Sequence, residues 1–252
     1  MNIELLIAAG VIALILQFFD ASLGQGYGTL TPILIILGFD PLDVVLAVLL
    51  TSFALSGVTA LLHHSYRNID FSFEKKDFKI AIMLSGFGIL GVALGVLLAV
   101  NMPDYALKGY IGAVIIITGI AVFLKNKTRS VSWRRLVALG SIASFNKGMT
   151  GGGFGPVLAG GQIISGVKSR SAVAITAFVE SIVSLAGVII FLITIGFTST
   201  EGWLIAALLI GGLISTPAAV YIVKHINLNK LRYLIGSAAI LSGMIVFLEL
   251  FI

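Results

Sequence analysis

The chain has no cysteine, only five prolines and few charged residues among its 252 positions. Without cysteine it can form neither disulfides nor thiolate metal sites. The three histidines are not clustered, and no HExxH, GxSxG or phosphate-loop motif is present, which argues against catalysis. Charged residues make up 11% and hydrophobic residues 58% of the chain, with a mean hydropathy of +1.12. We therefore expect a membrane protein that is not an enzyme and needs no cofactor.

Long apolar stretches, such as 80–100 and 107–124, are sufficient to cross about 30 Å of hydrocarbon as helices. Glycine is abundant, at 29 residues, which suits close packing between membrane helices. Gly91 and Gly95 form a GxxxG face, and we interpret it as a helix contact inside one protomer rather than a dimer seam. The net charge of +5 comes from short loops, so it indicates membrane orientation and not nucleic-acid binding.

The chain contains an internal duplication. The run GQGYGTLTPIL at 24–34 reappears 124 residues later as GMTGGGFGPVL at 148–158. Residues 107–124 match residues 231–248 at the same offset. An apolar chain made of two copies of one glycine-broken unit is typical of secondary transporters, whose site lies where the broken segments meet.

We predict an all-α membrane protein with two inverted-topology repeats, 1–124 and 134–252, joined by a linker at 125–133. Each repeat has about five helical segments. The predicted segments are 3–22, 28–38, 41–63, 78–100 and 105–124, then 134–146, 152–165, 169–195, 202–224 and 231–251. Segments 28–38 and 134–146 are too short to cross a bilayer at about 1.5 Å per residue, so we expect discontinuous or re-entrant helices at the glycine-rich turns.

The basic residues predict the orientation. The joint at 125–135 carries five of the 16 Lys and Arg residues, and only Lys108 and Lys147 fall outside it and the loops 63–79, 167–170 and 224–232. Basic loops face the cytoplasm, and counting helices outward from the joint puts all four on that side. With five segments each, the halves then lie in opposite orientations. Treating 134–165 as one broken crossing would instead place two basic loops outside, which disfavours that alternative.

The glycine-rich turns are the first candidate site. Non-helical backbone at membrane depth must line a cavity or be buried in protein, and a helix N-terminus after such a turn offers N–H donors to an anion. The alternative is a pair of tight helix contacts without a ligand. The candidate substrate-binding residues at these turns are Gln25, Gly26, Gly28 and Thr29 in the first copy and Asn146, Lys147, Gly148, Thr150, Gly151, Gly152 and Gly153 in the second.

Three ionisable residues, Asp20, Lys147 and Glu180, lie within apolar spans, where a charge costs several kcal/mol and usually has a function. We expect Lys147 near mid-depth as the cation for one central site; snorkelling to an interface or an ion pair with Asp20 are its alternatives. Glu180 could load and release protons, or it could be a carboxylate satisfied by neighbouring hydroxyls. Asp20 could pair with Lys147 or carry a proton.

Hydroxyls provide two further candidates for substrate binding. Thr51 and Thr176 occupy matching places in AVxxT strings of the two halves, although such hydroxyls often bond to their own helix backbone. His63 and His64 end a predicted helix beside a basic loop, and we interpret them as interface residues rather than metal ligands.

The paired glycine-rich turns followed by Pro-x-Leu, the AVxxT strings and the duplicated last helix resemble the sulfite exporter TauE/SafE family over nearly the whole chain. The second turn is close to the family pattern, whereas Tyr27 and Thr29 interrupt the glycines of the first. The resemblance implies a multi-pass plasma-membrane protein of a bacterium or archaeon that moves sulfite, sulfoacetate or related sulfur-containing anions.

Together these features predict a secondary transporter, in the exporting direction, that works by alternating access at a midplane site between the repeats. Its partners are then the lipid bilayer and a small anionic substrate, with the 125–135 loop cytoplasmic; a homodimer is compatible with so small a carrier. The alternatives are a passive anion channel and a proton-coupled carrier of another small organic anion. A carrier of cations or neutral solutes and an intramembrane enzyme are weaker alternatives.

Overall fold

The computed structural model describes residues 3–39, 41–99, 131–150, 154–194 and 202–248, with five isolated positions between 113 and 120. Every element in these ranges is helical. The elements are α1 (Ile3–Leu23), the 3-10 turn η1 (Tyr27–Thr29), α2 (Leu30–Ile36), α3 (Pro41–Ser65), α4 (Lys76–Ala99), α6 (Trp133–Thr150), α7 (Phe154–Ile164), α8 (Ser169–Thr194), α9 (Gly202–His225) and α10 (Leu228–Leu248). The predicted helix 105–124 lies largely outside the described residues.

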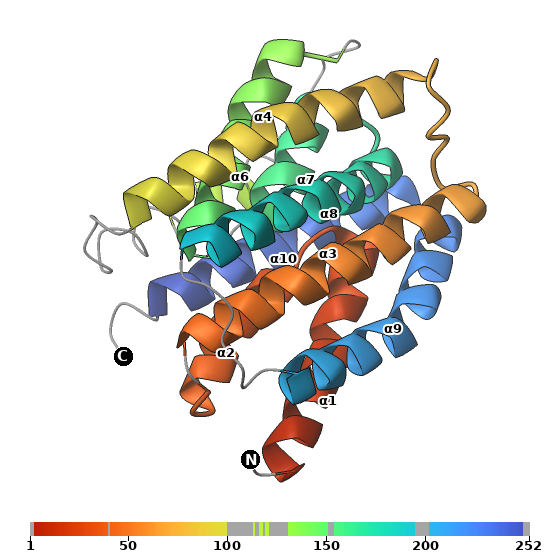
Figure 1. Cartoon of the computed structure of the whole chain (residues 1–252). Helices are drawn as coiled ribbons and strands as arrows, with labels where there is room; N and C mark the ends of the chain where they lie inside the picture. The colour runs from red at the N-terminus through yellow and green to blue at the C-terminus, as the bar shows by residue number, and fades with distance from the viewer. Residues whose placement is uncertain are drawn as a thin grey trace.

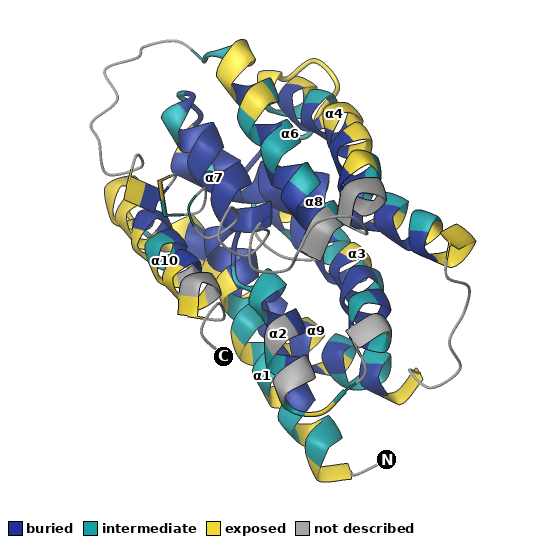
Figure 2. Ribbon diagram, turned by 90° about the vertical axis from the view of Figure 1, so that its left-hand side faces the viewer, coloured by how far each residue is buried: buried dark blue, intermediate teal, exposed yellow. Residues whose placement is uncertain are grey.

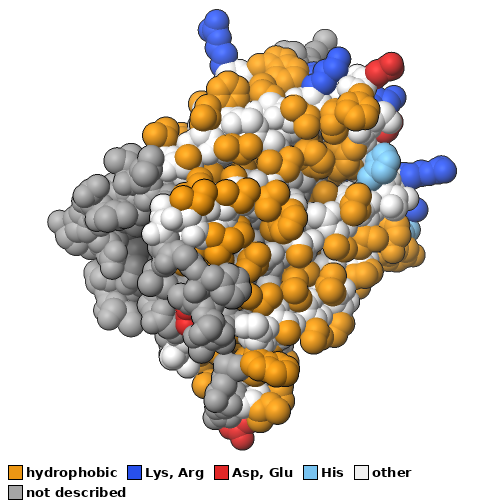
Figure 3. All heavy atoms as spheres, viewed as in Figure 1, with side chains coloured by type: hydrophobic (Ala, Val, Ile, Leu, Met, Phe, Trp, Pro, Cys, Tyr) orange, Lys and Arg blue, Asp and Glu red, His pale blue; other side chains and the backbone are white. Residues whose placement is uncertain are grey.

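Five of the described helices, α1, α3, α4, α8 and α9, are long and apolar enough to cross a membrane. Large hydrophobic side chains such as Ile3, Leu90 and Trp203 are exposed on the outside, and they cover most of the face in Figure 3. Asp20, Lys147 and Glu180 are instead buried. Apolar groups outside and charges inside reverse the pattern of a soluble protein. The prediction of an all-α membrane protein is confirmed.

The helices pack as three crossing pairs: α4 with α6, α3 with α8, and α1 with α9. In Figure 1 the α3–α8 pair lies in the middle, between α4 and α6 above and α1 and α9 below. Each pair takes one helix from each half of the chain. The α1–α9 contact corresponds to the α6–α4 contact when the offset of 124 residues is applied, so the packing is reciprocal as well as interleaved.

Glycines allow the outer pairs to approach closely. A Cβ on Gly91 would lie 2.9 Å from the Ser141 backbone oxygen of α6, and Gly95 lies against the backbone of Phe145. In the α1–α9 pair, a Cβ on Gly10 would lie 3.2 Å from the Ala207 backbone oxygen. The interpretation of Gly91 and Gly95 as an internal helix contact is therefore confirmed.

Helices α6 and α7 form a hairpin. The Ser132 N–H donates to the Ser165 backbone oxygen at 2.9 Å, and Arg135 Nη1 donates to the Ile164 oxygen at 3.3 Å, so the start of α6 lies beside the end of α7. The hairpin returns to the end of the molecule from which it starts, as predicted for 134–165. Helix α7 is buried almost throughout (Figure 2).

Loops rich in basic residues meet at one end of the molecule. Arg170 Nε donates to the Val223 backbone oxygen at 3.0 Å, and its Nη2 donates to the Ile226 oxygen at 3.3 Å. The Ser171 hydroxyl donates to Asp77 Oδ2 at 2.8 Å. These bonds join the start of α8 to the start of α4 and to the end of α9, and the Arg135 bond joins the start of α6 to the end of α7. Lys and Arg side chains accordingly gather at the upper and right-hand edge in Figure 3.

One interface prediction is wrong. His63 is fully buried, with Nε2 3.0 Å from the Ala21 oxygen and Nδ1 3.0 Å from Asn68 Nδ2, whereas His64 is exposed. The cause is the segment after α3, which folds back over the end of the helix: the Asn68 N–H donates to the His63 backbone oxygen at 2.9 Å.

The close approach of α4 to α6 predicts a matched pair of substitutions in α4. Gly91→Ala would place a methyl group against rigid backbone and should lower the free energy of unfolding by about 1–3 kcal/mol. Gly86 lies on the same helix with open space around its Cα, so Gly86→Ala should leave stability unchanged. Thermal unfolding of the two purified variants in detergent tests this, and equal melting temperatures would contradict the described α4–α6 packing.

Candidate functional site

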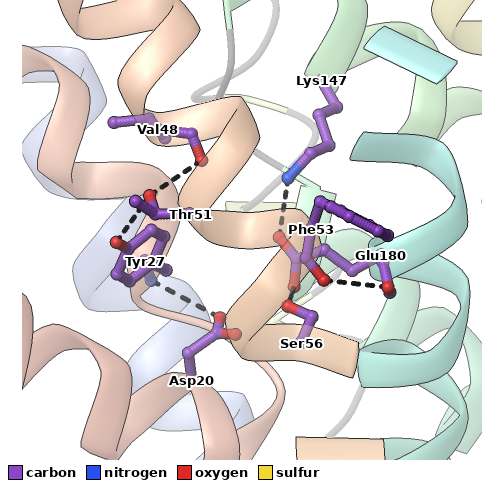
Figure 4. A network of polar contacts seen from close by, with 9 residues as sticks. Asp20, Tyr27, Val48, Thr51, Phe53, Ser56, Lys147 and Glu180 are labelled. Atoms are coloured by element: carbon purple, nitrogen blue, oxygen red, sulfur yellow. Dashed lines mark hydrogen bonds and ion pairs between the residues drawn. The ribbon is translucent and has the colours of Figure 1, made fainter. Parts of the chain in front are cut away.

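A buried ion pair lies where α3 and α8 cross. Lys147 Nζ donates to Glu180 Oε1 at 2.7 Å, and the Ser56 hydroxyl donates to Glu180 Oε2 at 3.3 Å. The two charged residues are only 2% and 3% exposed. Figure 4 shows Lys147 reaching from α6 toward the carboxylate of α8, with Ser56 approaching from α3. Lys147 therefore lies in the interior and does not snorkel to an interface.

Asp20 adds a second carboxyl group to this cluster. It lies near the end of α1, is 4% exposed and interacts electrostatically with both Glu180 and Lys147. Its Oδ1 accepts a long hydrogen bond of 3.4 Å from the Tyr27 N–H. An ion pair between Lys147 and Asp20 is one of the alternatives that the sequence leaves open; the direct partner of Lys147 is Glu180.

Tyr27 extends the polar network into the first half. Its hydroxyl donates to Thr51 Oγ1 at 2.8 Å, and Thr51 donates in turn to the Ala47 backbone oxygen at 2.7 Å. In the sequence, Tyr27 stands out only as an interruption of the glycines. An aromatic hydroxyl inside a glycine-rich turn of an apolar chain was the available signal, because a buried tyrosine hydroxyl needs a polar partner.

The cluster lies at the centre of the duplicated arrangement. Ser56 and Glu180, which are hydrogen-bonded, stand 124 residues apart, within one residue of the 125-residue spacing between the matching Thr51 and Thr176. Gly57 and Ser181 are separated by the same offset and are also in contact. Leu49 meanwhile packs on Gly187, so α3 and α8 run antiparallel. The contacts at the cluster therefore join nearly matching positions of the two halves of the chain.

The first glycine-rich turn contacts the start of the second half-helix. Gly24 and Gly26 have φ angles of +72° and +139°, which a side chain would strain, so the chain needs glycine there. Gly155 near the start of α7 lies directly against the Gly24 oxygen and the Gln25 backbone. Gln25 Nε2 donates to the Ile235 oxygen at 2.6 Å, while its Oε1 is buried without a hydrogen-bond partner.

The remaining candidates of the first turn and of α8 are bonded locally. Thr29 donates to the Gly26 oxygen at 2.7 Å, and Gly28 lies within η1. Thr176 is fully buried and accepts a hydrogen bond of 2.9 Å from Gln162 Nε2. The side chain of Thr176 also lies close to Gly24, so it borders the first turn although it is not part of the charged cluster.

The second turn begins later than predicted. Helix α6 continues to Thr150, so Gly148 is helical and packs against the backbone of Val92 in α4. The prediction of a turn at Gly148 is wrong because the glycine serves close helix packing there. Asn146 is buried beside Lys147. The side chain of Thr150 and residues 151–153 lie outside the description, so the predicted roles of Thr150 and the three glycines stay predictions.

This arrangement suits ion exchange better than metal binding. Among the described residues no three His, Asp or Glu side chains converge as a metal site. The cluster instead combines one ammonium group, two carboxyl groups and several hydroxyls, all shielded from water. An anion could be held by the ammonium group if Glu180 gave way, and the two carboxyl groups could exchange protons. Since these side chains are buried, access to them requires movement of the surrounding helices.

The comparisons with known proteins are consistent with this geometry. The model of the family described as sulfite exporter TauE/SafE matches residues 9–246. The chain is also 26% identical over 248 residues to the probable membrane transporter protein YtnM of Bacillus subtilis (strain 168), covering 94% of this chain and 80% of that protein.

The ion pair predicts strongly non-additive substitutions. Lys147→Met or Glu180→Met alone leaves an unpaired charge in the interior and should cost about 3–5 kcal/mol of stability. The double variant removes both charges and should recover most of that loss. Thermal unfolding of the three variants in detergent measures the coupling; losses that simply add would show that the two side chains do not interact.

Proposed function

Because the chain belongs to the sulfite exporter TauE/SafE family, we propose that it is a secondary transporter that exports small sulfur-containing anions such as sulfite or organosulfonates. The observation that carries the proposal is the Lys147 ammonium group, which is 2% exposed and lies deep among apolar helices. A buried cation in a membrane transporter marks a substrate or ion pathway by default, and a sulfur oxyanion is a complementary ligand for it.

Reciprocal packing supports the inverted-repeat organisation. The α1–α9 and α6–α4 contacts correspond to each other under the internal offset, and Ser56 is hydrogen-bonded to Glu180, the neighbour of its equivalent residue Ser181. We assign residues 1–124 and 134–252 to the two repeats and 125–133 to the linker. The gathered basic loops then face the cytoplasm by the positive-inside rule, in the plasma membrane of a bacterium or archaeon.

The anion binds, in this proposal, between Lys147 and the start of α7. Helix N-termini offer free N–H donors and a partial positive charge, and α7 begins at Phe154, whose ring lies 5.3 Å from Lys147 Nζ. Residues 151–153 precede this helix in the sequence, and in this proposal their backbone N–H groups would be further donors. Hydroxyls of Thr29, Thr51, Thr150 and Thr176, together with Gln25 and Asn146, are the polar groups that would complete the site.

A carrier fits these features better than a channel. The described members of the cluster are buried, and the charge is concentrated at one place rather than repeated along a path. Secondary transporters with paired discontinuous helices expose such a site alternately to each side. Counterflow of labelled substrate without unitary currents in a planar bilayer distinguishes a carrier from a channel.

Removal of the ammonium group should abolish most anion binding. We expect Lys147→Ala to weaken binding of sulfite, sulfoacetate or methanesulfonate about tenfold to a hundredfold, because a charge-assisted hydrogen bond contributes about 1.5–3 kcal/mol. Titration calorimetry of the purified protein measures this change. Lys168→Ala, which removes an exposed cation, is the matched control.

The folding state of the variant must be controlled. The double variant Lys147→Gln/Glu180→Gln has no unpaired charge, and it should lose anion binding to the same extent while remaining folded. Wild-type affinity in either folded variant would remove Lys147 from the substrate site.

A further inference from the structure

The buried cluster contains more acidic than basic groups. Two carboxyl groups, Asp20 and Glu180, face one ammonium group, Lys147. The other buried ionisable groups in the described ranges are Tyr27 and His63, and His63 is bonded to the Ala21 oxygen and to Asn68. A net charge away from water costs several kcal/mol. The cluster is neutral when the two carboxyl groups together keep one proton.

Glu180 carries the negative charge in the described conformation. Both of its oxygens accept hydrogen bonds, from Lys147 at 2.7 Å and from Ser56 at 3.3 Å. The proton that keeps the cluster neutral therefore belongs to Asp20. Lys147 is thereby occupied by a side chain of the protein itself, and a substrate anion must displace the Glu180 carboxylate to reach it.

Displacement without a proton would leave an uncompensated charge. One ammonium group would then face the bound anion and the free Glu180 carboxylate in the same interior. If Glu180 takes up a proton as it leaves Lys147, the cluster and its ligand remain neutral. The bound anion takes the place of the Glu180 carboxylate beside Lys147, and Glu180 becomes protonated. One proton is therefore taken up with each monovalent anion.

The described helices that pack on α8 bring few other charges to Glu180. Asp20 comes from α1, Tyr27 from η1 and Lys147 from α6, and all three act on the cluster. Helix α7 has no ionisable residue. Helices α3, α4 and α10 carry theirs only near their ends: Asp43, His63, His64, Lys76, Asp77, Lys79, Lys230, Arg232 and Tyr233. Among the described residues, Asp20 and Lys147 are thus the charges that decide the protonation of Glu180.

On the basis of the proposed function, we propose that Glu180 is the coupling residue of an electroneutral proton–anion symporter. Glu180 holds Lys147 in the empty carrier and, on taking up a proton, releases it to a monovalent sulfur oxyanion. On the opposite side of the membrane the anion leaves, Glu180 gives up its proton and the ion pair forms again. The membrane potential then contributes nothing to transport, and direction follows the anion and proton gradients alone; when the exterior is the more acidic side, export requires an outward anion gradient steeper than the inward proton gradient.

Proteoliposomes containing the purified chain test this with labelled methanesulfonate, which stays monovalent across the tested pH range. An acidic exterior should drive accumulation inside, and a potassium diffusion potential set with valinomycin should not change the rate. In binding titrations the affinity should fall about tenfold per pH unit over the range in which the proton is lost, as one linked proton requires.

Substitutions of Glu180 and Asp20 test which of the two carboxyl groups couples anion transport to proton transport. In the Asp20→Asn background, where no second carboxyl group can take over the negative charge, Glu180→Gln should keep methanesulfonate counterflow, lose accumulation driven by the pH gradient, make affinity independent of pH and make transport sensitive to the potential. Asp20→Asn imitates the protonated carboxyl group, so it should keep the coupling. Glu74→Gln, at an exposed position, is the matched control and should behave like the wild type.

The outcomes separate the two proposals. A wild-type protein that exchanges methanesulfonate at no pH contradicts the proposed function itself. Exchange that is electrogenic and indifferent to the pH gradient keeps the transporter and overturns the coupling. Loss of coupling in Asp20→Asn with normal coupling in Glu180→Gln would transfer the role to Asp20. The wild-type measurements decide the question even if a variant fails to fold.

Discussion

An ammonium group and a carboxylate removed from water each cost several kcal/mol unless they are paired and hydrogen-bonded, and this constraint governs the centre of the molecule. Lys147 comes from α6, Glu180 from α8 and Ser56 from α3, and their bonds of 2.7 and 3.3 Å fix the register of three helices from both halves of the chain. Any arrangement that slid α8 along α3 by one turn would leave both charges unpaired in the interior.

Glycine makes that arrangement attainable. In lipid there is little hydrophobic drive to bring helices together, so close van der Waals packing must supply the attraction. Gly91 and Gly95 let α4 approach the backbone of α6, and Gly10 does the same for α1 and α9. Gly155 then fits against the turn at Gly24, which brings the first turn to the start of α7, near the charged cluster.

Much of this organisation could be read from the sequence. The apolar spans predicted the helices to within a few residues, and the rarity of charge within them singled out Asp20, Lys147 and Glu180. The partner of Lys147 could not be read, because Glu180 stands 33 residues away and their meeting depends on how α6 crosses α8. Gly148 was misplaced for a related reason: a glycine that serves a helix contact resembles a glycine that makes a turn until the opposing helix is known.

The packing of helices from one half of the chain against helices from the other also determines which parts of the protein can move. Alternating access is usually pictured as one repeat rocking against the other, but α1 packs on α9 and α4 on α6, so each tight outer pair takes one helix from each half of the chain. Separating the two halves would break these glycine contacts. Moving the α1–α9 pair against the α4–α6 pair would keep them, with the α3–α8 crossing between as the pivot (Figure 1). Asp20 belongs to one pair and Lys147 to the other, so that motion would change the distance between the charges that decide the protonation of Glu180.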